Sequence, residues 1–180
     1  MSARHATTVW LTGPPSSGKT TIAGALDAAL RARGENPFWI DGDELRKTVC
    51  RDLGFSREDR AENAQRAASL ALREAIDHDV VIVSLISPYA VDRLQVRHRH
   101  HEKGVRFIEV HVRCPPEIAE GRDVKGLYRR ARRGELAAMT GVGDPYEPPV
   151  SPEIVLDTDR LTVEEEVAAL LAELGLVPAA

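Results

Sequence analysis

The sequence has few cysteines and no long hydrophobic run, and each shortage excludes a class of protein. Cys50 and Cys114 are the only cysteines among the 180 residues, and neither belongs to a paired motif that binds zinc. We therefore expect both to be reduced and structural rather than a disulfide or a redox pair. No run approaches the roughly 18 apolar residues that span a bilayer, and the first residues lack the apolar segment of a secretory signal. We expect a cytoplasmic protein that does not use a membrane.

The chain also lacks a strong excess of charge of either sign. Charged residues make up 29%, hydrophobic residues 43%, and the formal net charge is -4, which is ordinary for a globular protein. Nothing in this balance favours nucleic acid as a partner. The length suits one domain over residues 1–180, and we find no internal repeat or low-complexity linker.

A glycine-rich segment between an apolar run and a helical run organises the sequence. Residues 8–21 read TVWLTGPPSSGKTT, which contains the pattern Gly-x-x-x-x-Gly-Lys-Thr of a phosphate-binding loop. Gly13 and Gly18 permit backbone angles and close approach that a Cβ would prevent, so successive N–H groups can surround a phosphate. The helix that follows adds the positive end of its dipole. A chance glycine-rich turn is the alternative, but the motif has its strand and its helix on either side.

The loop pattern assigns a chemical task to its polar residues. We expect Lys19 to contact the β- and γ-phosphates of ATP and the Thr20 hydroxyl to bind Mg²⁺. Thr21 also suits an ordinary helix position. The expected nucleotide-binding residues are Gly13, Ser16, Ser17, Gly18, Lys19, Thr20 and Thr21.

Two aspartates follow the next predicted strand, which covers residues 36–40. Because ligands of open parallel sheets bind outside the carboxyl ends of the strands, Asp41 and Asp43 should both face the phosphate loop. An alternative is that Asp43 only caps the helix that follows it. The next buried strand, residues 79–84, ends in Ser84, where many phosphate-loop proteins have an acidic magnesium ligand. A carboxylate for Mg²⁺ or for the acceptor hydroxyl must then come from elsewhere, and Asp41 and Asp43 are the nearest candidates.

Strand and helix patterns alternate along the rest of the chain, which predicts an α/β fold with a mostly parallel central sheet and helices on both faces. Ser56 begins a capping motif for a long helix that should end near Asp77, with Phe55 placed to pack against its first turn. His98 and His101 we interpret as part of a solvated basic face, not as a metal site. Further helices are expected over 88–103, from 116 and from 163, the last capped by Thr162, and further strands over 105–112 and 154–157.

Residues 122–147 form a segment of different character, with many cations, few acids and thin apolar content. We predict a basic lid that places cations on a transferring phosphoryl group and excludes water. A solvated helical insertion is the alternative. The cations are Arg122, Lys125, Arg129, Arg130, Arg132 and Arg133.

With these segments in place, the chain resembles the adenylyl-sulfate kinase family, whose members use ATP to phosphorylate the 3′-hydroxyl of adenosine 5′-phosphosulfate (APS). A phosphate loop alone would indicate only a superfamily, and the later blocks are the specific ones. They are residues 41–43 with Arg46, residues 52–56 with 59–60 and 62–63, residues 86–89, residues 122–123 with 125–128, and residues 140–141 with 145–147. The resemblance implies a three-layer P-loop kinase fold, ATP and Mg²⁺ as cofactors, a small-molecule nucleotide as substrate and a homodimer.

The resemblance also implies roles for individual residues. Asp41 and Asp43 serve magnesium and the acceptor hydroxyl, with Asp43 nearest the attacking oxygen, and Lys125 is a lid lysine near the phosphates. These two aspartates, Lys19 and Lys125 are the expected catalytic residues, and Thr20 and Asp43 the expected metal ligands. The expected contacts to the acceptor are Arg46, Arg60 and Asn63 at the phosphosulfate, Phe55 and Met139 at the adenine, Ile86 and Ser87 along the nucleoside, and Lys125 at the phosphates.

Three departures from the family pattern keep two other functions open. Glu44 stands where the family has Asn, Met139 where it has Phe, and Pro14-Pro15-Ser16-Ser17 replaces a Leu-Ser-Gly-Ala type of loop. The prolines should stiffen the loop without deleting its donors, because the missing N–H groups lie at its start. The first alternative is a kinase of the same fold for another nucleotide or small alcohol. The second is a nucleotide-binding domain without catalysis.

Overall fold

A five-stranded sheet forms the centre of the computed structural model, which describes residues 6–123, 125–135, 139–141 and 144–176. All of its neighbouring strands pair in parallel, in the order β2-β3-β1-β4-β5. The strands are β1 (Thr7–Thr12), β2 (Pro37–Asp41), β3 (Val80–Ser84), β4 (Arg106–Arg113) and β5 (Ile154–Asp157).

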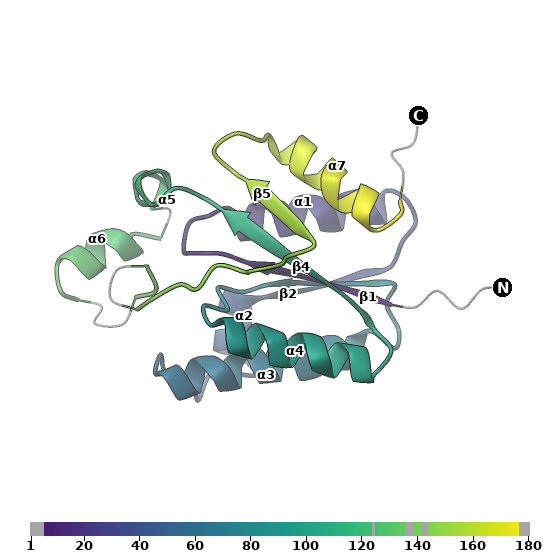
Figure 1. Cartoon of the computed structure of the whole chain (residues 1–180), viewed down its shortest axis with the longest axis horizontal. Coiled ribbons are helices and arrows are strands. Elements are labelled where there is room, and N and C mark those ends of the chain that lie inside the picture. Colours follow the sequence, from purple (N-terminus) through teal and green to yellow (C-terminus); the bar gives the residue numbers. More distant parts are fainter. Residues whose placement is uncertain (1–5, 124, 136–138, 142–143, 177–180) are drawn as a thin grey trace.

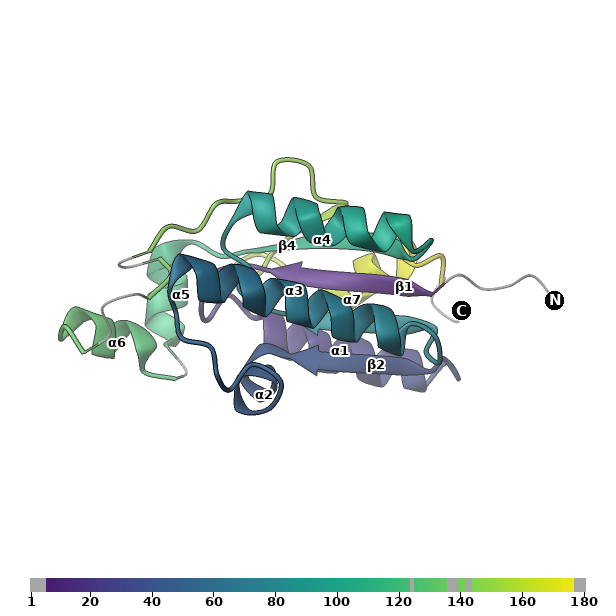
Figure 2. The same ribbon diagram turned by 90° about the horizontal axis from the view of Figure 1, so that it is seen from below.

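Helices cover both faces of this sheet, as Figures 1 and 2 show. On one face α1 (Lys19–Arg31) packs beside α7 (Val163–Glu173), and on the other α3 (Arg57–Glu74) packs beside α4 (Ala90–Glu102). The three-layer α/β fold expected from the sequence is therefore confirmed. The remaining helices are α2 (Gly42–Lys47), α5 (Pro116–Arg122) and α6 (Leu127–Arg132). Within the described ranges, no helix has the length and apolar character needed to cross a membrane.

The central strand β1 is buried along its whole length and contributes side chains to two hydrophobic cores. Val9 and Leu11 belong to the core under α1 and α7, whereas Trp10 belongs to the core under α3 and α4. This alternation follows from the period of two residues along a strand. Because β1 lies between β3 and β4, the direction in which the chain adds strands reverses at β1. The ligand crevice of such sheets opens at this reversal, beyond the carboxyl ends of the strands.

Both cysteines are free and buried, as expected. Cys50 lies in the core under α3, and Cys114 follows β4 and packs in a small cluster beneath the lid.

The start of α3 differs in detail from the sequence expectation. The Ser56 hydroxyl accepts the Asp59 N–H at 3.0 Å, which confirms the cap. Phe55, however, is 59% exposed, so most of its surface is left uncovered by the first turn. Helix α3 also ends at Glu74, and residues 75–77 continue as a turn.

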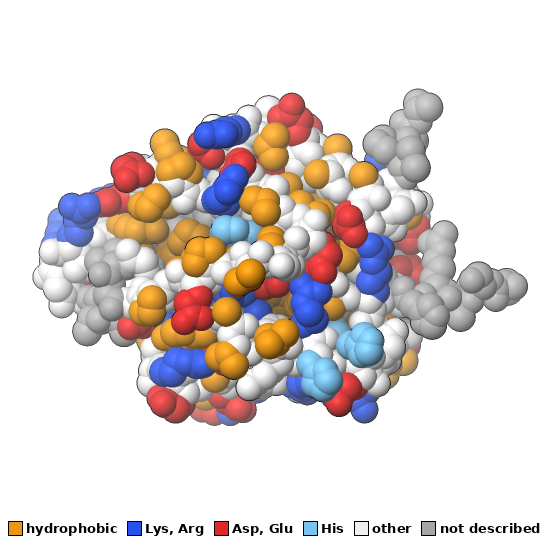
Figure 3. All heavy atoms as spheres, viewed as in Figure 1, with side chains coloured by type: hydrophobic (Ala, Val, Ile, Leu, Met, Phe, Trp, Pro, Cys, Tyr) orange, Lys and Arg blue, Asp and Glu red, His pale blue; other side chains and the backbone are white. Residues whose placement is uncertain are grey.

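The predicted lid projects from the carboxyl ends of the strands, away from both termini (Figure 1). It contains α6 and is attached to the phosphate loop, because the Tyr128 hydroxyl donates to the Pro15 carbonyl at 3.2 Å. Of the predicted lid, positions 124, 136–138 and 142–143 lie outside the described residues. Figure 3 shows acidic, basic and hydrophobic side chains interspersed over the face of the molecule that it presents.

Candidate active site

The phosphate loop joins β1 to α1 and needs its glycines for steric reasons. A Cβ on Gly13 would overlap the Val112 carbonyl oxygen and lie 2.8 Å from the Ser17 hydroxyl. Gly18 has φ 106 and Ser16 φ 59, so the chain turns through the left-handed region twice before α1 begins. Within the described part of the chain no side chain caps α1, which leaves its first N–H groups for an anion.

Lys19 is buried, with its amine folded back across the loop. Its Nζ donates to the carbonyls of Gly13 at 2.8 Å and Pro14 at 2.7 Å, and lies 3.3 Å from the Ser17 hydroxyl. Burial and the nearby charge of Lys125 lower the pKa of Lys19 to about 7. A phosphate anion would oppose both effects, because it stabilises the charged amine.

Asp41, at the carboxyl end of β2, connects three elements through its carboxylate. One oxygen accepts the Asp43 N–H at 2.9 Å and caps α2. The other lies 3.2 Å from the Ser84 hydroxyl and 3.4 Å from the Thr20 hydroxyl. The alternative that Asp43 only caps this helix is wrong: α2 begins at Gly42, so Asp41 occupies the cap position.

Asp43 is thereby left free for the crevice, where its carboxylate forms an ion pair with Lys125 of the lid. Carboxylate and hydroxyl oxygens are the ligands that Mg²⁺ uses, together with waters and substrate phosphates. Asp41, Asp43 and Thr20 supply such donors beside the phosphate loop, so the residues present fit the ion.

Phe55 stands between two cations on the acceptor side of the site. The guanidinium of Arg46 lies 4.7 Å from the centroid of the exposed Phe55 ring, and that of Arg60 lies 5.7 Å from it. Burial and repulsion from Arg60 lower the pKa of Arg46. An anion placed between these arginines would relieve their repulsion, while the ring offers a face for a flat base.

Arg60 and Asn63 lie one turn apart on α3 and are both buried. Arg60 donates to the Phe55 carbonyl at 3.1 Å and pairs with Asp144 of the lid at 3.2 Å. The Oδ1 atom of Asn63 is buried and has no hydrogen-bond partner among the described residues. A buried amide oxygen costs free energy until a donor reaches it, which fits a position next to a ligand.

Ile86 and Ser87 are held from behind by side chains of β1. The Thr12 hydroxyl donates to the Ile86 carbonyl at 2.6 Å, and the indole N–H of Trp10 donates to the Ser87 hydroxyl at 3.1 Å. The Ser87 side chain is therefore engaged in the interior, and the backbone is the part of this segment that can border a ligand.

Met139 does not join the other predicted acceptor residues. It is 6% exposed and packs in the lid cluster with Cys114, Ala119 and Tyr128. Its contact with a substrate base remains a prediction. Glu44, the other departure, is an exposed side chain paired with Lys47 at 2.6 Å, so its extra negative charge is compensated locally.

Thr158 lies beside the phosphate loop, at a position that no sequence pattern identified. It follows β5 and accepts two hydrogen bonds from Arg122, at 3.0 Å through its hydroxyl and 2.6 Å through its carbonyl. Both residues flank the start of α1, since a Cβ built on Gly18 would lie 3.7 Å from Thr158 and 3.9 Å from Arg122. No motif marks Thr158, but the rule that ligands gather at the carboxyl ends of strands would have found it.

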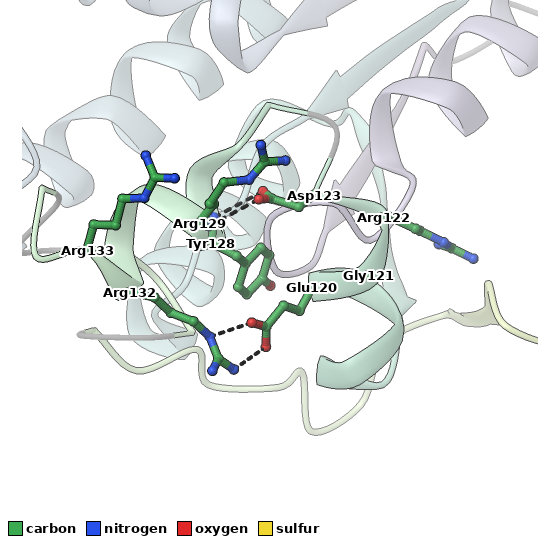
Figure 4. A pocket seen from close by; sticks show the side chains of 8 residues that line it. All are labelled: Glu120, Gly121, Arg122, Asp123, Tyr128, Arg129, Arg132 and Arg133. Atoms are coloured by element: carbon green, nitrogen blue, oxygen red, sulfur yellow. Dashed lines mark hydrogen bonds and ion pairs between the residues drawn. The ribbon is translucent and has the colours of Figure 1, made fainter.

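The cations of the lid divide between two places. A lid pocket of about 420 Å³ lies between α5 and α6 (Figure 4). In it Glu120 pairs with Arg132 at 2.6 Å, and Asp123 accepts the backbone N–H of Arg129 at 3.1 Å. Arg122 points away from the other labelled side chains of this pocket. Lys125 pairs with Asp43 in the crevice. The lid thus contributes Arg122 and Lys125 to the site, while Arg132 stabilises the lid itself.

The parallel sheet, the phosphate loop between β1 and α1, and the carboxylates at the end of β2 define a P-loop kinase. A family model described as Adenylylsulphate kinase matches residues 5–157. The chain is 48% identical over 166 residues to an adenylyl-sulfate kinase of Saccharomyces bayanus, covering 92% of this chain and 82% of that one. It is 44% identical over 177 residues to that of Paraburkholderia xenovorans, covering 97% and 96%.

Among solved structures, it is similar to the Mycobacterium tuberculosis APS kinase in complex with AMPPNP and APS. That match has a TM-score of 0.92 and 38% identity, and covers 95% of this chain and 98% of the other. The chain belongs to the adenylyl-sulfate kinase family, which confirms the resemblance seen in its sequence.

Proposed function

We propose that this protein transfers the γ-phosphoryl group of ATP to the 3′-hydroxyl of APS, giving 3′-phosphoadenosine 5′-phosphosulfate and ADP. One observation carries the proposal: besides a phosphate loop, the protein has an exposed Phe55 ring near the guanidinium groups of Arg46 and Arg60. That second surface suits an acceptor with a flat base and an anionic end. The similar M. tuberculosis structure, which contains AMPPNP and APS, supports both halves.

On the donor side, the ATP phosphates occupy the loop and attract the Lys19 amine. Thr20, Asp41 and Asp43 would hold Mg²⁺, which would supply charge neutralisation for the phosphates. The phosphates replace the loop carbonyls as partners of Lys19, so the amine is fully charged when the donor is bound. Arg122 and Thr158 then lie at the end of the loop near the start of α1.

On the acceptor side, Arg46, Arg60 and Asn63 hold the phosphosulfate, and Phe55 stacks on the adenine. Asp144 must release Arg60 at least in part, because both anions compete for the same guanidinium. Ile86 and Ser87 border the nucleoside through their backbone.

The reaction is an in-line displacement. The 3′-oxygen of APS forms a bond to the γ-phosphorus, the bond from that phosphorus to the β,γ-bridging oxygen of ATP breaks, and ADP leaves with the electron pair. Asp43 orients the attacking hydroxyl and accepts its proton. Lys125, paired with Asp43 before the substrates bind, moves to the phosphates and leaves the carboxylate free for this task. Most of the rate enhancement comes from position and charge neutralisation.

The test is ADP release from MgATP with and without APS, on the native protein and on Asp43→Asn. We expect strong stimulation by APS that the variant loses. Asp27→Asn is the matched control, because Asp27 is on α1 and pairs only with Arg31 among the ion pairs of the described residues. Native protein that binds ATP but shows no stimulation by APS refutes the proposal, and equal losses in the two variants refute the role of Asp43.

We propose further that the protein works as a homodimer, as the family resemblance implies, and in the cytoplasm, as expected from its sequence. The dimer is tested by light scattering after size exclusion, where a mass near 19.7 kDa would refute it because that is the mass of one chain.

A further inference from the structure

Arg93 of α4 is a buried arginine outside the phosphate loop and the acceptor surface described above. Its side chain is 2% exposed. Burying a guanidinium costs free energy unless its N–H groups are bound and its charge is compensated. The partners that meet this cost show what the residue holds in place.

The three nitrogens of Arg93 bind three separate segments of the chain. Nε donates to the Glu109 carboxylate of β4 at 2.7 Å, Nη1 to the Ser87 carbonyl at 2.6 Å, and Nη2 to the Glu147 carbonyl at 2.7 Å. Two of these acceptors are main-chain carbonyls. One guanidinium therefore fixes the backbone that follows β3 against the backbone that ends the lid.

The Ser87 backbone needs such support. Ser87 has φ 43, in the left-handed region that a residue with a Cβ avoids, and such a conformation persists only where the surroundings hold it. Arg93 binds its carbonyl from α4, and Thr12 approaches the same carbonyl from β1 at 3.3 Å. We call Ile86 and Ser87 the acceptor wall.

The end of the lid is attached to the same place. We call Tyr146 and Glu147 the lid root. The Glu147 N–H donates to the Pro88 carbonyl at 2.8 Å, and its carboxylate accepts the Ala90 N–H at 2.7 Å. The Tyr146 hydroxyl lies 3.1 Å from the Thr12 hydroxyl, and burial raises the pKa of Tyr146 to about 12, so the phenol stays neutral.

Glu109 compensates the charge of Arg93 and is itself fixed. Its second carboxylate oxygen accepts from Arg97 at 3.1 Å, and Arg97 pairs with Glu153 at 2.6 Å. The Glu109 N–H donates to Glu153 at 2.7 Å. These four side chains are two cations and two anions, so the cluster has no net charge. Its hydrogen bonds hold Arg93 in one orientation.

We propose that Arg93 is a positioning residue for the acceptor substrate, holding the acceptor wall and the lid root in one geometry without touching the substrate. The proposal rests on the proposed function, in which the acceptor wall borders the APS nucleoside. It predicts that APS binding and lid placement depend on Arg93, whereas MgATP binding at the phosphate loop does not.

Arg93→Lys is the informative variant. The lysine keeps the charge that pairs with Glu109, but a single ammonium does not reproduce the planar fork that reaches two carbonyls as well. We expect the KM for APS to rise at least tenfold and the KM for MgATP to change less than twofold. Glu109→Gln, which keeps the shape of the partner and weakens its hold on Arg93, should produce a smaller rise of the same kind. If Arg93→Lys does not fold, the KM values of Glu109→Gln test the positioning role of Arg93 instead.

Arg99→Lys is the matched control on the same helix. Arg99 donates to the Gln65 carbonyl at 3.0 Å and to the Ser69 hydroxyl at 2.9 Å, so it joins α4 to α3 and contacts neither the acceptor wall nor the lid root. We expect both KM values of this variant to stay within twofold of the native protein.

The outcomes separate this inference from the proposed function. A folded Arg93→Lys with an unchanged KM for APS overturns the inference, as does a parallel rise in both KM values, which would indicate a general structural defect. Equal effects of Arg93→Lys and Arg99→Lys overturn it as well. Failure of the native protein to turn over APS overturns the proposed function and this inference together, and is seen before any variant is made.

Discussion

The Lys19 amine should take up a proton when a nucleotide binds. In the free protein the pKa of Lys19 is lowered to about 7, first by burial and then by Lys125. The partners of its amine are the neutral groups of Gly13, Pro14 and Ser17. Nucleotide phosphates bring negative charge to this amine and return its pKa toward the ordinary value of a lysine.

The size of the uptake follows from the titration of one group. With a pKa of about 7, the amine is about nine-tenths neutral at pH 8 and about one-tenth neutral at pH 6. ADP binding should therefore take up about 0.9 proton per site at pH 8, and Lys19 should account for about 0.1 at pH 6. The sign is uptake in both cases, because the bound state has the higher pKa.

Isothermal titration calorimetry measures this uptake directly. Binding of MgADP at pH 8 is recorded in buffers of different ionisation enthalpy, and the slope of the observed enthalpy gives the number of protons. The phosphates of the nucleotide are already ionised at this pH. Lys19→Met should remove the uptake, and Lys125→Met should reduce it because one cause of the lowered pKa is gone. A slope near zero for the native protein, or the same slope in Lys19→Met, would refute the reasoning.

Three further predictions concern stability. His100 is fully buried, and burial lowers its pKa. The free energy of unfolding should therefore decrease as the pH drops below the pKa of histidine in the unfolded chain, by at most about 1.4 kcal/mol per pH unit. Unfolding titrations between pH 7 and 5 should show a shallower pH dependence for His100→Phe than for the native protein. Gly13→Ala should destabilise the fold by more than about 1 kcal/mol and weaken nucleotide binding, because the new Cβ meets the Val112 carbonyl. The control Gly121→Ala, at a position of α5 with open space around it, should neither destabilise the fold nor weaken binding. Urea unfolding and nucleotide titrations measure both effects. Thr162→Ala removes the capping box of α7 and should cost about 1 kcal/mol in urea unfolding, and a change near zero would show that α7 is held by packing alone.

Local sequence patterns determined the elements of the fold and the donor half of the site. The spacing of Gly13, Gly18 and Lys19 predicted the phosphate loop, because the requirement for small residues and a cation is local to the turn. The apolar runs predicted the strands, and Ser56 and Thr162 predicted helix starts, since caps act within one turn. The later blocks of residues indicated the family, because they match its motifs in order along most of the chain.

Contacts between distant segments were decided only by the tertiary structure. Which of Asp41 and Asp43 caps α2 depended on where β2 ends, and this is set by its pairing with β3 rather than by its own residues. The ion pair of Asp43 with Lys125 and the burial of Met139 depend on how the lid packs on the sheet. Thr158 and Arg93 carry no local signal, because Thr158 binds Arg122, and Arg93 binds Glu109 and Glu147, which are distant in the sequence. The sequence by itself determined what chemistry the loop performs, and the packing of the lid and α4 decided which groups meet around it.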